Sequence, residues 1–152
     1  MKIKIMIDAN VLIHILLKSD IIQKDSLIKL FKEKEKYQFV TTTRIIDEVI
    51  FKLIVISSGK NLKQLKKDKE LLKNQIYIIE IIQNFLRDFE FKVYEIKQKH
   101  YWKMSDIIQE YGLLGNDALT MIIMKENDLI YLATLDTDFE NTYLKNILKG
   151  QE

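Results

Sequence analysis

The sequence predicts an α/β fold in which a mostly parallel central sheet is flanked by helices. Short runs rich in β-branched and aromatic residues alternate along the chain with longer segments whose apolar residues recur at helical spacing. The predicted strands cover residues 2–7, 37–41, 91–94 and 129–134. No linker rich in Pro or Gly and no internal repeat divides the chain, so we expect a single domain over residues 1–152.

Composition supports a folded protein and excludes several kinds of site. Of the 152 residues, 47% are hydrophobic and 30% are charged, which is enough apolar material for one core. The net charge of +2 neither requires nor excludes a polyanionic partner. The chain has no Cys, which excludes disulfides, thiolate metal sites and Cys nucleophiles. Asp8 and Asn10 interrupt the apolar start, and no apolar run approaches the ~18 residues of a membrane span, so we expect a cytoplasmic protein.

The first half of the chain alternates strands and amphipathic helices. The strand at 2–7 stops at Asp8, as a buried strand does at the edge of a sheet. We expect a short helix over 10–17, and a second helix that is capped by Ser19 or Asp20 and runs to about Lys36. After the strand at 37–41, three consecutive threonines offer N-caps for a helix that ends near Gly59.

The second half begins with a segment in which charged residues surround regularly spaced leucines. Residues 61–73 favour a solvated helix or a helical hairpin. The elements expected after it are a helix over 76–89, the short strand at 91–94, one helix over 97–111, a helix capped by Asn116, the strand at 129–134, and a strand or turn over 143–148.

Four acidic residues stand where strands end or where the following helices begin: Asp8, Glu48, Asp117 and Asp136. In open parallel sheets the ligand site lies outside the carboxyl ends of the strands, so these side chains are expected to converge. Taken singly, an acid at such a position more often caps a helix or fills a turn. Gathered together, four carboxylates repel one another unless a cation compensates them, and hard oxygen ligands suit Mg²⁺ or Mn²⁺.

The segments that carry these acids resemble those of PIN-domain nucleases in order and type. They read IDANVLI, RIIDEVIFKL, GNDALTMII and YLATLDTDF, and the resemblance extends from Asp8 to Phe139. Within that family the chain is most similar to the toxin ribonucleases of type II toxin–antitoxin pairs. The resemblance implies a three-layer sandwich and a single PIN-like domain over 1–152, with a helical insertion at about 59–90.

The resemblance also implies roles for individual residues. Asp8, Glu48, Asp117 and Asp136 match the family's catalytic, metal-binding acids, whereas Asn10 and Thr134 match its supporting polar positions. The implied activity is Mg²⁺- or Mn²⁺-dependent hydrolysis of phosphodiester bonds in single-stranded or structured RNA. The implied partners are the RNA substrate, a cognate antitoxin protein and a second copy of the chain in a homodimer, with no membrane association.

Two further acids compete for these roles. Asp47 adjoins Glu48, but neighbouring residues on a helix point about 100° apart, so only one of them can face a common site. The family pattern favours Glu48. Asp138 lies two residues after Asp136 and is interpreted as a solvated turn residue outside the ligand set.

Several alternatives remain open at this level. His14 and His100 follow no pattern that brings them to the acids, and we interpret both as structural. The basic run at 60–73 is either a solvated helix face or a surface that steers phosphates toward the site. A Mg²⁺-binding receiver-like phosphoacceptor domain is a competing class, although the chain lacks that class's acidic pair and Lys. The catalytic residues do not separate a toxin from an RNA-processing or decay nuclease.

Overall fold

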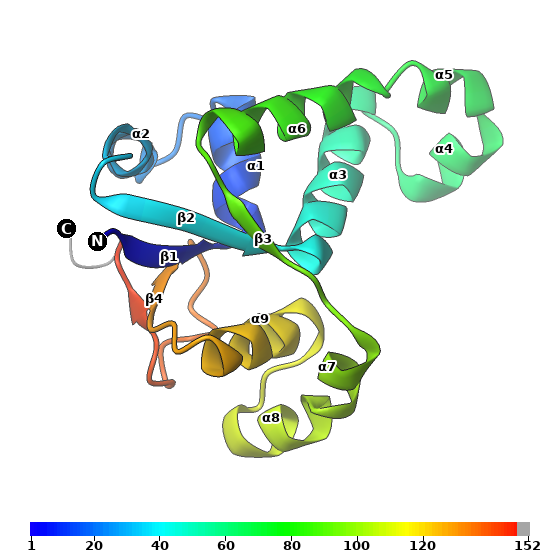
Figure 1. The fold of residues 1–152 in the computed structure, drawn as a ribbon. Coiled ribbons are helices and arrows are strands. Elements are labelled where there is room, and N and C mark those ends of the chain that lie inside the picture. Colours follow the sequence, from blue (N-terminus) through cyan, green and yellow to red (C-terminus); the bar gives the residue numbers. More distant parts are fainter. Residues whose placement is uncertain (149–152) are drawn as a thin grey trace.

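A computed structural model describes residues 1–148 and shows a five-stranded sheet in the order β3-β2-β1-β4-β5 (Figure 1). The strands are β1 (Ile3–Ile7), β2 (Tyr37–Thr42), β3 (Lys92–Tyr94), β4 (Tyr131–Ala133) and β5 (Lys145–Asn146). Every pairing is parallel, with Ile5 of β1 opposite Phe39 on one side and Tyr131 on the other. All the strands therefore end at the same edge of the sheet.

Helices cover both faces of this sheet and form the outer layers (Figure 1). One face carries α1 (Ala9–Leu17), α2 (Lys24–Lys32), α3 (Thr43–Ser58) and α6 (Tyr77–Asp88), and the other carries α7 (Gln98–Trp102), α8 (Met104–Tyr111) and α9 (Gly115–Glu126). The predicted α/β class with a parallel central sheet is confirmed. Within residues 1–148, no helix is both long and apolar enough to cross a membrane.

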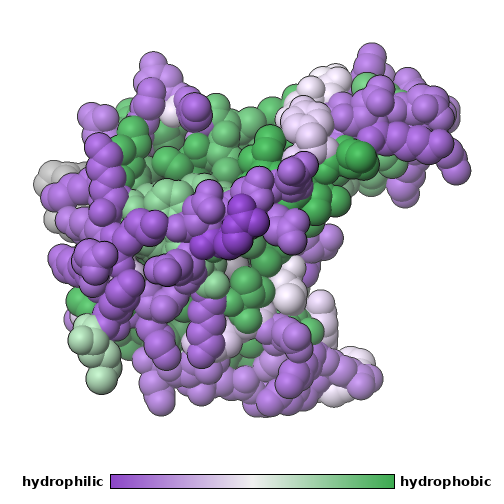
Figure 2. All heavy atoms as spheres, turned by 45° about the horizontal axis from the view of Figure 1, so that its top comes forward, coloured by the Kyte–Doolittle hydropathy of each residue, from purple (hydrophilic) through white to green (hydrophobic). Residues whose placement is uncertain are grey.

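Two short helices, α4 (Leu62–Lys67) and α5 (Lys69–Lys73), project from the end of α3 before the chain returns in α6 (Figure 1). Their surface is strongly hydrophilic in the space-filling view (Figure 2). This hairpin is the form predicted for 61–73. The wider prediction of a single domain over 1–152 with an insertion at about 59–90 stays a prediction. Residues 149–152 of that predicted domain lie outside the described part of the chain.

The central strands and α9 consist mostly of apolar residues because they lie in the hydrophobic core. Residues 5–7 of β1 are fully buried because helices cover both faces of the sheet. A cluster of phenylalanines joins α2 and α6 to β2. Phe31 and Phe39 have ring centroids 5.0 Å apart, and Phe85 and Phe89 are 4.6 Å apart. Core packing, and not base stacking, is therefore the role of these rings.

Besides shifts of one or two residues at the ends of several elements, three features differ from the sequence expectation. The second helix begins only at Lys24, because the chain after α1 first turns through Lys18 in the left-handed region, with φ 53°, and it ends at Lys32, before the predicted end at about Lys36. The helix expected over 97–111 is broken at Lys103 into α7 and α8. Asn116 does not cap α9, whose N-cap position is Leu114; it lies in the first turn with its side chain turned to another partner.

Replacing Phe31 with Ala is expected to destabilise the protein by about 3–5 kcal/mol, because the ring is 4% exposed and contacts four other phenylalanines. The measurement is chemical denaturation monitored by circular dichroism. Phe51→Ala is the matched control, since Phe51 is 45% exposed and its loss leaves no comparable cavity. Equal destabilisation by the two substitutions would contradict the proposed core.

Candidate active site

The four acids predicted from the sequence line one cavity of about 230 Å³ at the carboxyl edge of the sheet. Asp8 follows β1, Asp136 follows β4, Glu48 lies in the second turn of α3, and Asp117 lies in the first turn of α9. The cavity is also lined by Ala9, Asn10, Lys52, Leu114 and Asn116. Parallel strand order thus brings together residues that are up to 128 positions apart in the sequence.

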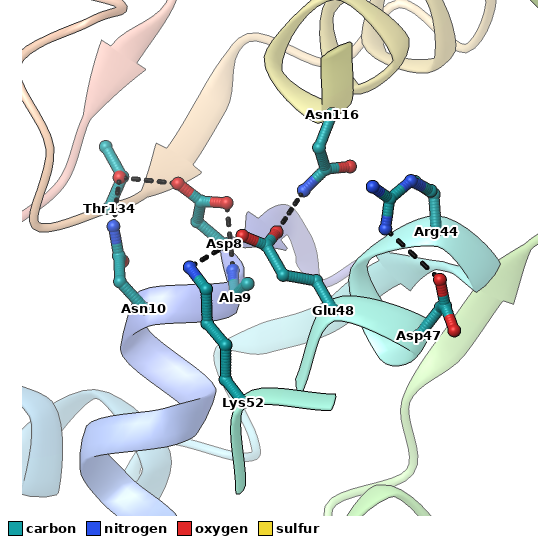
Figure 3. Close-up of polar contacts among 9 residues, drawn as sticks. All are labelled: Asp8, Ala9, Asn10, Arg44, Asp47, Glu48, Lys52, Asn116 and Thr134. Atoms are coloured by element: carbon teal, nitrogen blue, oxygen red, sulfur yellow. Dashed lines mark hydrogen bonds and ion pairs between the residues drawn. The ribbon is translucent and has the colours of Figure 1, made fainter. Parts of the chain in front are cut away.

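Asp8 is the buried member of the group, with 4% of its surface exposed. One carboxylate oxygen accepts a hydrogen bond from the backbone N–H of Ala9 at 2.8 Å, and the other accepts one from the Thr134 hydroxyl at 2.7 Å (Figure 3). Burial raises the pKa of Asp8, and these two hydrogen bonds act in the opposite direction. Asp8 is also the N-cap of α1, so its backbone position is fixed by the helix.

Thr134 is the centre of the polar network that supports Asp8. Its hydroxyl accepts hydrogen bonds from the Asn10 side-chain amide at 3.3 Å and from the backbone N–H of Asp136 at 3.1 Å. The Asn10 carbonyl oxygen in turn accepts from the backbone N–H of Leu135 at 3.1 Å. The start of α1 and the loop after β4 are therefore joined directly by hydrogen bonds of Asn10 and Thr134.

Asn146, on β5, completes this network and was not foreseen from the sequence. Its side-chain oxygen accepts from the backbone N–H of Thr134 at 3.2 Å, and its amide donates to the Thr134 carbonyl at 2.8 Å. The one available signal was an Asn among the apolar residues of 143–148. That signal does not reveal which strand the side chain meets.

Glu48 is held by two donors, one at each carboxylate oxygen (Figure 3). Lys52, one helical turn further along α3, places its ammonium nitrogen 2.7 Å from one oxygen. The side-chain amide of Asn116 donates to the other at 2.8 Å. Asp47 points elsewhere, with its side chain 77% exposed and 3.3 Å from Arg44. Glu48, and not Asp47, therefore faces the cavity. The i,i+4 spacing of Glu48 and Lys52 was a usable signal for this ion pair.

Asp117 experiences the like charges of the other acids. Burial, the charge of Asp8, and the neighbouring Asp138 and Asp136 together raise the pKa of Asp117 to about 7. Asp138 is exposed, as expected of a turn residue, yet its carboxyl group lies close enough to Asp117 to contribute by charge and by hydrogen bonding. Asp138 is thus a neighbour of the site that the sequence interpretation had left out.

The donor set of the cavity fits a hard divalent cation, since it holds four carboxylates, and burial together with the like charges of its neighbours raises the pKa of Asp117. The side chains do not form a finished cage: among residues 1–148, no three acidic or His side chains are grouped closely enough to hold a metal ion as they stand. Glu48 is committed to Lys52 and Asn116. Small side-chain movements are therefore part of any metal binding here.

Neither histidine lines this cavity. His100 is buried between α7 and α9, where its Nδ1 accepts from the backbone N–H of Lys97 at 2.8 Å and its Nε2 lies 2.9 Å from Glu126. His14 lines a separate apolar cavity beside α2. These positions agree with structural roles.

Comparison with known proteins decides the family, because the model of the PIN domain matches residues 5–145. The chain belongs to the PIN-domain family. Membership removes the receiver-like phosphoacceptor alternative, which belongs to a different fold family. Of the PIN-domain acids expected from the motifs, all four lie in the one cavity described above.

This PIN-domain chain is similar to Ribonuclease VapC2 of Methanocaldococcus jannaschii, with 28% identity over 146 residues that cover 96% of this chain and 93% of the relative. Two solved structures share its fold. One is VapBC2 from Rickettsia felis bound to a DNA fragment from their promoter (TM-score 0.62, 14% identity, 95% of this chain and 98% of the other). The second is a toxin–antitoxin complex from Klebsiella pneumoniae (TM-score 0.53, 17% identity, 93% and 96%).

The raised pKa of Asp117 predicts how the stability of the metal-free protein depends on pH. An acid whose pKa is about 7 in the folded state and 3.8 otherwise favours folding in its protonated form. Its destabilising effect is therefore small near pH 4, grows as the pH rises, and is complete above pH 7. In EDTA, we expect Asp117→Asn to have nearly the same Tm as the wild type near pH 4 and a clearly higher Tm at pH 8.

The matched control is Asp47→Asn, which removes a charge outside the cavity. Thermal unfolding from pH 4 to pH 8 gives the comparison. A gain in Tm at pH 8 that is the same for both variants would show that net charge, and not the cavity, is responsible.

Proposed function

We propose that this chain is a Mg²⁺- or Mn²⁺-dependent endoribonuclease that hydrolyses phosphodiester bonds in RNA and acts as the toxin of a type II toxin–antitoxin pair. The observation that carries the proposal is the convergence of four carboxylates in one cavity of a PIN-domain chain. Similarity to a named ribonuclease along nearly the whole chain supports the reaction. The fold shared with two toxin–antitoxin structures supports the biological role.

In this proposal Asp8, Asp117 and Asp136 hold the metal ion and Glu48 completes the set. When bound, the ion supplies a water of lowered pKa and polarises a phosphoryl oxygen. Thr134 fixes the orientation of Asp8 through its short hydrogen bond, and Asn10 holds Thr134. Glu48 orients the attacking water while Lys52 and Asn116 hold its carboxylate in place. No protein nucleophile is needed.

The proposed partners follow from the same similarity. A cognate antitoxin protein would bind this chain, since the Klebsiella pneumoniae structure that shares its fold is a toxin–antitoxin complex. A homodimer is proposed on the resemblance to PIN-domain toxins. Size-exclusion chromatography with light scattering tests the dimer independently of activity.

Purified protein is expected to cleave single-stranded RNA with Mg²⁺ or Mn²⁺ and to lose activity in EDTA. Asp117→Asn should lower the rate at least ~100-fold, because it removes a charged ligand from the cavity. Asp47→Asn is the control and should retain the wild-type rate, since Asp47 is outside the cavity. Gel analysis of end-labelled RNA gives the rates. If RNA were cleaved at the wild-type rate both in EDTA and by Asp117→Asn, the proposed site would be wrong.

The toxin role has its own test. Induced expression of the wild-type chain in a bacterial host should arrest growth, whereas Asp117→Asn at the same protein level should not. Colony counts after induction and immunoblots for protein level provide the measurement. Growth without arrest, in cells whose extracted protein still cleaves RNA, would favour a processing or decay nuclease over a toxin.

A further inference from the structure

The projecting hairpin concentrates the positive charge of the molecule. We call residues 60–73 the lysine arm; it comprises α4, α5 and the residues that join α4 to α3. It contains six lysines against two acids, a net charge of +4, whereas the whole chain has a net charge of +2. The rest of the chain is therefore net negative by two charges, in addition to being locally acidic at the cavity.

The lysines of the arm do not hold the fold together. All six are exposed, and within residues 1–148 only Lys73 forms an ion pair, with Glu70 at 3.1 Å. Asp68 is used as a helix cap and accepts from the backbone N–H of Leu71. Leu65 is the one buried residue of the two helices. Five ammonium groups are thus left with no carboxylate partner in the described structure and are open to an external anion.

Helix α3 connects the cavity to the arm. Glu48, Lys52 and Ile56 are spaced four residues apart and share one helix face, on which Lys52 and Ile56 are exposed. The helix ends at Gly59, whose positive φ of 69° turns the chain into the arm. Eleven residues at 1.5 Å each separate Glu48 from Gly59 by about 16 Å. Figure 2 shows a hollow in the surface beneath the arm. In Figure 1, the arm lies on one side of the edge where the strands end, and the α7–α8 pair lies on the other.

An acidic cavity that cleaves RNA needs a cationic surface elsewhere, because its own carboxylates repel the phosphate backbone. We propose that the lysine arm binds the backbone of the RNA strand whose scissile bond lies in the acidic cavity, with Lys52 as the cation nearest the cleavage point. This inference rests on the ribonuclease proposal above. At about 3.4 Å per stacked nucleotide, a strand must extend about five nucleotides from the cavity to reach the arm.

The test compares two triple variants in the non-cleaving Asp117→Asn background. The arm variant carries Lys63→Gln, Lys66→Gln and Lys67→Gln, all exposed positions of α4. The control variant carries Lys4→Gln, Lys29→Gln and Lys32→Gln, which are also exposed but lie on β1 and α2. Both lose three charges, and Gln has nearly the helix propensity of Lys. Circular dichroism melts should show matching Tm values for the two variants.

Fluorescence anisotropy then gives the Kd for single-stranded RNAs of about 20 and about 4 nucleotides over a range of salt concentrations. For the long RNA, the arm variant should bind at least ~10-fold more weakly than the parent, and the slope of log K against log salt should fall by about 2, from ~0.7 per lost phosphate contact. The control variant should show less than about twofold weakening. The difference between the variants should disappear for the short RNA.

Equal weakening by both triple variants would overturn the arm proposal, because net charge alone would then explain binding. An arm variant with unchanged Kd and salt slope would also overturn it and would leave the arm to contact something other than RNA. If the wild-type chain cleaves RNA in either of these cases, the proposed nuclease function stands. If it neither binds nor cleaves RNA, both proposals fail together.

Discussion

Asp8 is a carboxylate almost fully buried from water, at the end of β1, the middle strand of the sheet. Burying a charge in that position costs free energy unless donors surround it. The donors come from Ala9 and Thr134, and Thr134 is held in turn by Asn10 and Asn146. The hydrogen bonds that surround the Asp8 carboxylate therefore also link β1, β4 and β5 to one another. The position of Asp136, two residues beyond Thr134, follows from the same bonds.

Repulsion among the acids is balanced unevenly across the cavity. Glu48 forms an ion pair with Lys52 and also accepts a hydrogen bond from the Asn116 amide. Among the four acids as described within residues 1–148, it alone has both kinds of partner. Within residues 1–148, Asp117 is paired with no cation; burial and the neighbouring carboxylates of Asp8 and Asp138 raise its pKa to about 7. The cavity therefore has a neutralised side at α3 and an uncompensated side at α9 and the loop after β4. A divalent cation in the cavity would be attracted most strongly to the uncompensated side.

The sequence was sufficient for the fold class and for the acids at the edge of the sheet, since both depend on local signals. Strand ends are marked by polar residues after apolar runs, and parallel order brings such ends together whatever the loops do. The partners of those acids depend on tertiary contacts. The spacing of Lys52 from Glu48 indicates their ion pair, but Asn116 resembled a helix cap and Asn146 lay in a segment predicted only as a strand or turn. Asp138 was interpreted as a solvated turn residue and left out of the site. It is indeed exposed, but its carboxyl group also lies close enough to Asp117 to raise the pKa of that residue.

Helix breaks were the least accessible feature. The division of 97–111 at Lys103 accompanies the burial of His100 against Glu126 on α9, a contact between residues 26 positions apart. No local pattern encodes it. The late start of α2 has a similar origin, since the chain must first reverse after α1 through the left-handed turn at Lys18.

The burial of α9 has a consequence for how the site tolerates change. Seven consecutive residues, 118–124, are buried, so this helix is enclosed around its whole circumference and cannot rotate without disturbing the core. The backbone of Asp117, in the first turn of α9, is therefore held in a fixed orientation. Asp136 and Asp138 instead lie on an exposed turn. The direction in which Asp117 faces the cavity is thus partly a property of hydrophobic packing. A substitution at Met121 or Met124, which are fully buried and do not line the cavity, would alter the placement of the Asp117 carboxylate through the orientation of the helix.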